Sequence, residues 1–393
     1  MAKSNPIIVV GAGQCGLKAT ETFRQLGYDG DLLLIGDEPS APYQRPPLSK
    51  AFLKSELNQE RLSLASPGYF DNHHIETRFG DKVSSLDVQA NVAVLSDGTR
   101  LPYSKLLLAT GSRARTIPMP GIDLPGVCLL RTLEDTKRLA GAIGTDSRIA
   151  IVGGGYIGLE VAASARALGH NVTILEGADR VLQRVVCPKI SQFFEDLHQR
   201  HGVDVRTGAR PTRILGEAQV SEVELAGGET INCDVVLVAV GGMADDHIAQ
   251  ASGLATNNGI VVDEACRTAA TNVFAAGDCA LFPSKRYDRP IRLESVQNAI
   301  DQGKAAAQAM LGEEVRYDPV PWFWSDQYDV KLQIAGLSQG YDRAEMAAGK
   351  APGSFAVTYL RNDRAICVDA VNNPRAHMTA RRDLAVADHS AMD

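Results

Sequence analysis

The chain has 393 residues, a length typical of two or three domains. Hydrophobic residues make up 45% of it and charged residues 22%, which is typical of a globular protein and argues against a long disordered tail. The 40 basic and 47 acidic residues give a formal net charge of −7, which disfavours a nucleic-acid-coating protein. No apolar run approaches the roughly 20 residues of a membrane helix, and the N-terminal one is too short for a signal peptide. The sequence therefore predicts a cytoplasmic protein with no nucleic-acid or membrane partner.

The first glycine cluster follows a short apolar run at the N-terminus. Residues 7–10 predict a buried strand, GAGQCG occupies positions 11–16, and a helical pattern covers 17–26. In such a strand–turn–helix unit Gly11 permits the turn, Gly13 lets backbone N–H groups approach a pyrophosphate, and Gly16 lets helix and strand pack closely. A diphosphate would lie at the helix N-terminus, where free N–H groups favour negative charge.

Further pieces of the same domain follow in the chain. A second predicted strand, 32–35, is followed by Asp37 and Glu38, whose carboxylates are placed to accept hydrogen bonds from ribose hydroxyls. Another strand, 106–108, leads through Ala109 into a glycine turn. The segment 117–126 is rich in Pro and Gly and predicts a linker.

The second glycine cluster repeats the first unit. Residues 148–152 predict a strand, GGGYIG occupies 153–158, a helix is predicted over 159–168, and a strand over 171–175. We expect nucleotide contacts from Gly153, Gly155, Tyr156, Ile157 and Gly158. Glu176 ends the second strand, where a carboxylate binds the free 2′-hydroxyl of NADH and repels the 2′-phosphate of NADPH. The sequence therefore favours NADH.

A third segment supports two dinucleotides in one chain. Residues 270–278 predict a short strand that ends at Gly277 and Asp278. Flavoproteins with two dinucleotide sites use such an aspartate to hold the ribityl chain of FAD. Together with the two glycine clusters, this segment predicts FAD and a nicotinamide nucleotide as cofactors.

The cysteines are informative through their spacing, because the closest two, Cys266 and Cys279, are 13 residues apart. No CxxC or CxxxxC occurs, so the chain offers neither a local redox dithiol nor a zinc knuckle, and we expect no metal site. An odd count without close pairs suits a reducing compartment. The seven positions are Cys15, Cys128, Cys187, Cys233, Cys266, Cys279 and Cys367.

The order of these pieces resembles that of the FAD-dependent pyridine nucleotide reductases of the glutathione reductase fold. The resemblance implies an α/β protein with two Rossmann-type dinucleotide-binding domains and a C-terminal α+β domain. Residues 1–113 and 243–318 would bind FAD, residues 114–242 would bind NADH, and residues 319–393 would form the third domain. In this last part we expect strands at 331–335, 354–360 and 365–371, a turn at Asn362 and Asp363, and a helix that begins at Pro374 with Asn373 as its cap.

Within this superfamily, RPPLSK at positions 45–50 resembles the motif of ferredoxin reductases that serve oxygenases. In related NADH peroxidases and oxidases a redox cysteine stands where Lys50 stands here, and disulfide reductases carry a CxxxxC pair in a comparable place. No cysteine lies between Cys15 and Cys128, so electrons would leave the flavin directly. The resemblance implies an acidic [2Fe-2S] ferredoxin as acceptor, which in turn feeds a cytochrome P450 or a Rieske oxygenase.

The resemblance also assigns residue roles. Lys50 and Glu160 would form an ion pair beside the flavin that orders the pocket and tunes its charge. The segment 321–328, PWFWSDQY, matches one whose second tryptophan, here Trp324, lies beside the flavin ring. The resemblance adds flavin or adenine contacts by Arg45, Val83, Arg131 and Val296. Cys15 lies inside the first glycine motif and counts among the cofactor-binding residues, where we expect it to act as a small packing residue.

Two other functions remain open from the sequence. An NADH oxidase or peroxidase would use oxygen or peroxide, and Lys50 in place of the redox cysteine argues against peroxide. A binding flavoprotein of the apoptosis-inducing-factor kind should have a basic surface, which the acidic net charge of this chain disfavours. Relatives usually have Pro-Asn after the glycine turn, where this chain has Gly241 to Asp245, and the C-terminus is short.

A ferredoxin would need a local basic patch, for which the candidates are Lys54, Lys285, Arg286, Arg289, Arg292, Arg375, Arg381 and Arg382.

Overall fold

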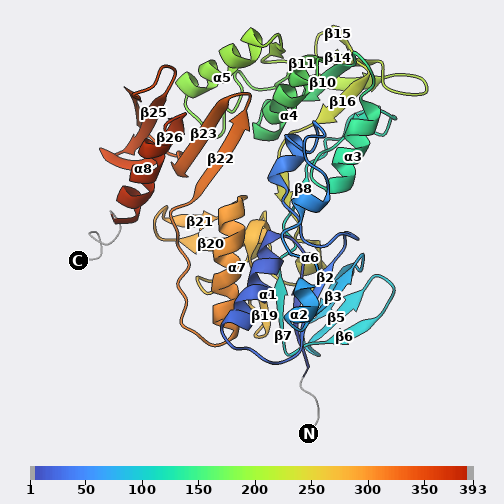
Figure 1. The fold of residues 1–393 in the computed structure, drawn as a ribbon, viewed down its shortest axis with the longest axis vertical. Helices are drawn as coiled ribbons and strands as arrows, with labels where there is room; N and C mark the ends of the chain where they lie inside the picture. Colours follow the sequence, from blue (N-terminus) through green and yellow to red (C-terminus); the bar gives the residue numbers. More distant parts are fainter. Residues whose placement is uncertain (1–4, 387–393) are drawn as a thin grey trace. The chain divides into compact units, whose positions relative to one another are not determined.

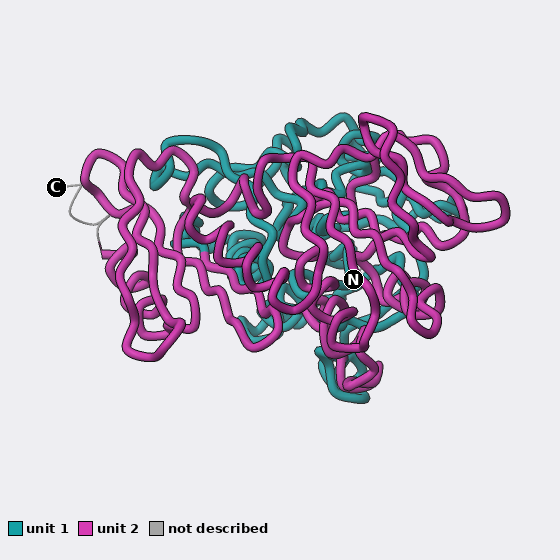
Figure 2. Tube along the Cα trace, turned by 90° about the horizontal axis from the view of Figure 1, so that it is seen from above, with its two compact units in different colours: residues 1–44, 63–113, 243–321 teal, residues 45–62, 114–242, 322–393 magenta. Residues whose placement is uncertain are grey.

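The computed structural model describes residues 5–386 and divides into two compact units (Figures 1 and 2). The first unit contains residues 1–44, 63–113 and 243–321, and the second contains 45–62, 114–242 and 322–393. The chain passes between them at five points, two of which lie within β8 (Ser112–Ala114) and β17 (Gly242–Ala244). The segment 45–62 and residues 322–386 thus group with the middle of the chain, while the expected boundaries of the three domains stay a prediction. No helix of the described residues is long and apolar enough to cross a membrane.

The first unit is built on a parallel five-stranded sheet in the order β19-β7-β1-β2-β3. The central strand is apolar and buried along its whole length, as expected for a strand with neighbours on both sides. The sheet strands are β1 (Ile7–Val10), β2 (Leu32–Gly36), β3 (Ile75–Phe79), β7 (Lys105–Leu108) and β19 (Val273–Ala275). The helices are α1 (Gln14–Gln25), α2 (Tyr69–Asn72), α6 (His247–Ala251) and α7 (Val296–Met310), and α1 packs against α7.

Two small sheets complete the first unit. One is antiparallel and contains β4 (Val83–Asp87), β5 (Val92–Leu95) and β6 (Arg100–Pro102). The other contains β18 (Ile260–Val261), β20 (Ala280–Ser284) and β21 (Arg289–Ile291), and the short η3 (Gly277–Cys279) joins β19 to β20.

The second unit contains another parallel sheet, in the order β12-β11-β10-β16-β9. Its strands are β9 (Val127–Cys128), β10 (Arg148–Val152), β11 (Asn171–Leu175), β12 (Asp204–Arg206) and β16 (Val235–Val238). The helices of this part are α3 (Leu133–Ala142), α4 (Tyr156–Ala167) and α5 (Pro188–Arg200), with η1 (Pro46–Ser49) and η2 (Glu60–Leu62) in the segment 45–62. An antiparallel sheet adds β13 (Pro211–Leu215), β14 (Glu222–Leu225) and β15 (Thr230–Asn232). Two parallel βαβ sheets confirm the expected α/β class.

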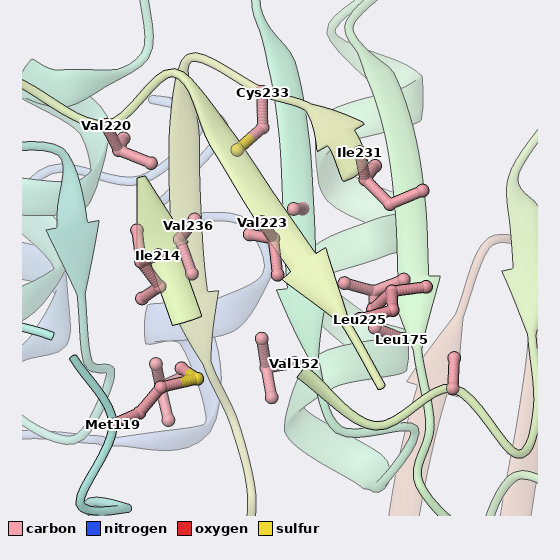
Figure 3. Packing of buried hydrophobic residues seen from close by; sticks show 13 residues of the cluster. Met119, Val152, Leu175, Ile214, Val220, Val223, Leu225, Ile231, Cys233 and Val236 are labelled. Carbon is pink, nitrogen blue, oxygen red and sulfur yellow. The ribbon is translucent and has the colours of Figure 1, made fainter. Parts of the chain in front are cut away.

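In the second unit, the core between the antiparallel sheet β13-β14-β15 and the parallel sheet shows that the linker prediction is wrong. Side chains of β13, β14 and β15 meet those of β10 and β16 in one apolar cluster (Figure 3). Met119 from the Pro/Gly-rich segment belongs to this cluster, and Ile117, Ile122 and Leu124 pack against it. A Cβ atom on Gly121 would lie 2.1 Å from the backbone oxygen of Ile214. The segment 117–126 lacks regular structure, but it is packed into the core and is not a free linker.

The C-terminal part of the second unit is an antiparallel sheet in the order β22-β23-β26-β25-β24, with α8 (Pro374–Val386) packed on β26 and β23. The strands are β22 (Trp322–Gln327), β23 (Val330–Gly336), β24 (Arg343–Ala348), β25 (Phe355–Arg361) and β26 (Arg364–Val371). The turn falls at Asn362 and Asp363, which have φ of 51° and 60°, and the Asn373 side chain caps α8 through the backbone N–H of Ala376 (3.2 Å).

Candidate functional site

The first glycine cluster lies at the carboxyl edge of the first unit's parallel sheet. The backbone N–H of Gly11 donates to Ile35 (2.7 Å) and that of Ala109 to Val10 (2.7 Å), so the turns after β1, β2 and β7 adjoin one another. The N–H of Ala276 donates to Leu108 (3.0 Å), which brings the end of β19 to the same edge. Ligands of open parallel sheets bind at this edge. The structure thus gathers the predicted residues Gly11, Gly13, Asp37, Ala109, Gly277 and Asp278 around it.

The glycines of this cluster divide into closed and open positions. A Cβ atom would lie 2.1 Å from the oxygen of Ala109 if built on Gly11, and 1.9 Å from the oxygen of Gly11 if built on Gly16. A Cβ atom on Gly13 would have no atom within 4 Å. The outer glycines are therefore required by the fold itself, whereas Gly13, at the start of α1, faces open space. This free helix N-terminus fits the pyrophosphate of FAD.

Asp278 lies in η3, just after β19, and is held there by hydrogen bonds. The hydroxyl of Ser112 donates to its Oδ2 (3.0 Å), and Arg292 donates to its backbone oxygen (2.9 Å). Arg292 also pairs with Glu294 (2.6 Å) and its side chain is only 11% exposed. We therefore assign Arg292 to the support of the Asp278 turn and remove it from the candidates for a docking patch.

The other predicted residues of the first unit hold varied positions. Glu38 accepts a hydrogen bond from Tyr43 Oη (2.5 Å), while Asp37 is exposed. Val83 is buried at the start of β4, and Val296 is the first residue of α7. Cys15 is buried where α1 meets Gly303 of α7, and burial raises the pKa of its thiol well above the ordinary value. That environment suits a packing residue and leaves the thiol unreactive.

The second glycine cluster has the same division. A Cβ atom would lie 2.5 Å from the oxygen of Ala239 if built on Gly153 and 2.2 Å from the oxygen of Gly153 if built on Gly158, whereas Gly155 has open space. Ile157 is 40% exposed at the start of α4. Tyr156 packs on Phe323 with ring centroids 4.7 Å apart, and its hydroxyl is buried without a partner among the described residues. The cluster fits the diphosphate of a nicotinamide nucleotide.

Glu176 is held at the end of β11 by both carboxylate oxygens. Its Oε2 accepts from the backbone N–H of Gly154 (2.7 Å) and its Oε1 from that of Ala178 (2.8 Å). The negative charge therefore has a fixed position beside the second glycine turn. Each oxygen keeps a further lone pair that can accept a hydrogen bond from a ribose hydroxyl.

Lys50 and Glu160 form the ion pair that the sequence predicted. Lys50 Nζ lies 2.7 Å from Glu160 Oε2, and the Glu160 side chain is 7% exposed. The same oxygen accepts from the hydroxyl of Ser49 (2.6 Å), and Oε1 accepts from that of Ser325 (2.7 Å). A buried carboxylate is costly unless it is paired and hydrogen-bonded, and here both conditions are met.

Sequence reasoning missed the two serines that hold Glu160. Ser49 lies inside the RPPLSK motif, next to Lys50, and Ser325 follows Trp324 in the aromatic segment. In both places the neighbouring residue, and not the serine, was predicted to have a role at the flavin. An isolated serine carries no periodicity that would indicate its partner. Their contacts connect positions 111 and 165 residues apart in the chain.

The remaining predicted flavin residues belong to the second unit. Arg45 Nη1 donates to the backbone oxygen of Arg131 (2.9 Å), so these two residues are in contact. Trp324 is half-buried on β22, with its ring centroid 5.8 Å from that of Trp322. Their roles toward FAD stay predictions.

Comparison with known proteins agrees with this architecture. Residues 5–303 match the family model described as pyridine nucleotide-disulphide oxidoreductase, and residues 322–391 match the reductase C-terminal model. The chain therefore belongs to the pyridine nucleotide-disulphide oxidoreductase family. It is an oxidoreductase that uses FAD and a nicotinamide nucleotide, as predicted.

Individual relatives narrow the class to ferredoxin reductases. The chain is 42% identical to rhodocoxin reductase of Rhodococcus erythropolis, over 96% of this chain and 89% of the relative. It is 40% identical to a ferredoxin–NAD(P)(+) reductase of a Sphingomonas species, over 96% of this chain and 92% of the relative. Among solved structures, the covalent putidaredoxin reductase–putidaredoxin complex matches with a TM-score of 0.93 and 37% identity, covering 97% of this chain and 93% of that one.

Proposed function

We propose that the protein transfers electrons from NADH to a [2Fe-2S] ferredoxin that supplies a cytochrome P450 or a Rieske oxygenase, in the cytoplasm. Bound FAD supplies the chemistry that accepts a hydride and releases single electrons. The chain's own residues hold the two dinucleotides through Gly13 and Gly155 and place the Lys50 ammonium on Glu160. The similar proteins named above, which include reductases of ferredoxins, support the proposal.

The observation that carries the proposal is the absence of a usable thiol in the part of the chain that the structure describes. All seven cysteines lie there, and all are buried and free. Cys266 and Cys279 lie close in sequence to the predicted FAD residues Gly277 and Asp278. Burial raises the pKa of both thiols above the ordinary value. By the resemblance described in the sequence analysis, Lys50 stands where NADH peroxidases and oxidases have a redox cysteine. Electrons therefore have no thiol to pass through and would leave the flavin directly, which favours a one-electron acceptor over a disulfide substrate.

The test is NADH-driven reduction of cytochrome c by the FAD-loaded protein, with and without a panel of [2Fe-2S] ferredoxins. We expect at least one ferredoxin to raise the rate well above the rate without it. Peroxide formed per NADH is measured in parallel without ferredoxin. A high peroxide yield that no ferredoxin lowers would assign the protein to the oxidases instead.

Glu176 provides a test of nucleotide preference. We expect Glu176→Gln to lower kcat/KM for NADH relative to NADPH by roughly tenfold, a change equivalent to about 1.4 kcal/mol. The reason is that the variant removes the charge that repels a 2′-phosphate while keeping a similar shape. Asp179→Asn, which neutralises an exposed carboxylate three residues further on, serves as control. An unchanged NADH to NADPH ratio in Glu176→Gln would show that another residue sets the preference.

The ionic-strength dependence tests the docking of an acidic ferredoxin. Arg375 and Arg382 are exposed on α8, and we take them as the basic patch of the second unit. We expect ferredoxin reduction to slow as salt rises, while NADH oxidation with a small neutral acceptor changes little. The double variant Arg375→Glu/Arg382→Glu should weaken both the rate and its salt dependence, whereas Lys350→Glu, at another exposed position, should not. Equal salt dependence with both acceptors would contradict the patch.

A further inference from the structure

The strand β22 presents alternate side chains to two different neighbours, as a strand must. On one face Trp322 packs on His377 of α8, with ring centroids 5.7 Å apart. On the opposite face Phe323 packs on Tyr156 of α4, and Ser325 donates its hydroxyl to Glu160 of the same helix. Gln327 is the next residue on that opposite face, so its side chain follows Ser325 along the strand.

Hydrogen bonds continue from Ser325 into α5. Gln327 Nε2 lies 3.3 Å from Ser325 Oγ, and Gln327 Oε1 lies 2.9 Å from His198 Nε2. His198 Nδ1 lies 3.3 Å from the hydroxyl of Tyr328, the residue after β22. Ser325 and His198 are 0% exposed and Gln327 is 1% exposed, so the chain of contacts runs through protein that excludes water.

The chemistry of these groups fixes the direction of every bond. Burial lowers the pKa of His198 to about 4, so at neutral pH the imidazole is uncharged and has a single N–H. Ser325 donates to Glu160 and therefore accepts from Gln327 Nε2, which leaves Gln327 Oε1 facing His198. The single hydrogen of the imidazole is then on Nε2, where it donates to Gln327 Oε1, and Nδ1 accepts from Tyr328. The amide of Gln327 then donates to Ser325, and Ser325 donates to Glu160. Each donor therefore points toward the carboxylate, the one member of the chain that only accepts.

The opposite oxygen of Glu160 is held from the other side. Ser49 and Lys50 both donate to Oε2, at 2.6 and 2.7 Å. Both oxygens of the carboxylate therefore accept hydrogen bonds. The carboxylate that pairs with the Lys50 ammonium cannot rotate without breaking a buried hydrogen bond. A buried acceptor that loses its donor is penalised strongly, so the whole arrangement has one low-energy geometry.

We propose that Ser325, Gln327 and His198 are positioning residues for the Lys50–Glu160 ion pair. They fix the carboxylate and, through it, the ammonium of Lys50. The consequence for the reaction rests on the proposed function, in which that ammonium lies beside the flavin and helps to align the nicotinamide. The hydrogen-bond chain itself does not depend on the proposed function.

Three variants test the effect on the reaction. Ser325→Ala removes the donor to Glu160, Ser325→Thr keeps a hydroxyl, and Ser191→Ala removes a similarly buried hydroxyl of α5 that donates to Val181 (2.6 Å). In single-turnover mixing of the FAD-loaded proteins with NADH, we expect Ser325→Ala to lower the limiting rate constant of flavin reduction roughly tenfold, because small misalignments are costly in rate. The Kd for NADH should change less than the rate constant, and Ser325→Thr should recover most of the loss.

The control separates positioning from general loosening. Melting temperatures are measured for all three variants, and Ser191→Ala should keep the wild-type rate constant even where its melting temperature falls. An unchanged rate constant in Ser325→Ala would overturn the proposal. An equal loss in Ser191→Ala would do the same, because the effect would then follow stability alone.

A second readout needs no turnover. In ¹⁵N-histidine-labelled protein at pH 7, with the His198 signals identified by a His198→Asn variant, we expect a neutral imidazole protonated on Nε2. Gln327→Leu should shift the Nε2 signal, because that variant removes its acceptor. A charged ring, an Nδ1–H tautomer or an unshifted signal would overturn the hydrogen-bond chain. If wild-type protein is not reduced by NADH, the proposed function fails, and this measurement still decides whether the chain exists.

Discussion

Gly155→Ala should weaken NADH binding while leaving the protein folded. The backbone at Gly155 is extended, with φ −82° and ψ −177°, and a Cβ atom there meets no protein atom within 4 Å. The methyl group would instead occupy the space through which the backbone approaches the diphosphate. We expect the Kd for NADH to rise roughly tenfold or more, equivalent to about 1.4 kcal/mol or more of lost binding free energy. Calorimetric titration measures it.

The matched control is Gly158→Ala, because its Cβ atom would lie 2.2 Å from the backbone oxygen of Gly153. Such overpacking costs about 1–3 kcal/mol of folding free energy, and each kcal/mol lowers the melting temperature by roughly 2–4 °C in a domain of this size. Gly155→Ala should melt within a degree or two of the wild type. If Gly155→Ala bound NADH normally, the open position would not be the nucleotide's approach.

The first cluster offers an independent repeat of the same comparison. Gly13→Ala should reduce FAD retention without unfolding the protein, whereas Gly16→Ala should destabilise it, because a Cβ atom on Gly16 would lie 1.9 Å from the oxygen of Gly11. The flavin absorbance of the purified variants measures retention. Full retention by Gly13→Ala would contradict the assignment of this cluster to FAD.

Local patterns predicted the strands around both clusters almost to the residue, because an apolar run followed by a glycine turn is specified by its own sequence. The helices begin earlier than predicted: α1 starts at Gln14 and α4 at Tyr156, whereas the apolar patterns indicated 17 and 159. The reason is that the first helical turn follows the glycine cluster at once and contains a glycine itself, at Gly16 or Gly158, which conceals the helical period.

Features that depend on tertiary contacts could not be predicted from the pattern. The Lys50–Glu160 pair was inferred only through a family resemblance, and the serine partners of Glu160 on β22 and in η1 were not predicted. The Pro/Gly-rich segment was predicted as a linker from its composition, but Met119 is buried by strands that lie roughly a hundred residues later. The edge strand β24 was missed, because most of its residues are exposed and no alternation marks them.

The stability of Asp369→Asn relative to the wild type should rise as pH increases from 5 to 7 and level off above that. Asp369 is 0% exposed in the middle of β26, where it accepts a hydrogen bond from Tyr359 and lies 3.9 Å from the thiol of Cys367. The Tyr359 hydroxyl also accepts a hydrogen bond from the backbone N–H of Cys187 (2.9 Å). Neither Tyr359 nor Cys367 carries a positive charge that could stabilise the ionised carboxyl. Burial therefore raises the pKa of Asp369 to about 7.

The sign follows from proton binding. Between the unfolded pKa of about 3.9 and the folded value of about 7, the native state holds a proton that the unfolded state has released. The stabilisation from this site is complete below pH 4 and is lost as pH rises through 7, with a limiting slope of about 1.4 kcal/mol per pH unit. Asparagine carries no proton to lose, so its melting temperature relative to the wild type should climb over that interval and level off above it.

Melting curves of both proteins at half-unit pH steps measure the difference, in which contributions from all other titrating groups cancel. Asp326→Asn, on β22 and 34% exposed in its pair with Lys331, controls for the substitution itself. A difference for Asp369→Asn that stayed flat from pH 5 to 8 would mean that the native state holds no extra proton at β26. The sheet would then bury a charged carboxylate that only the hydroxyl of Tyr359 and the weak thiol donor of Cys367 stabilise among the described contacts.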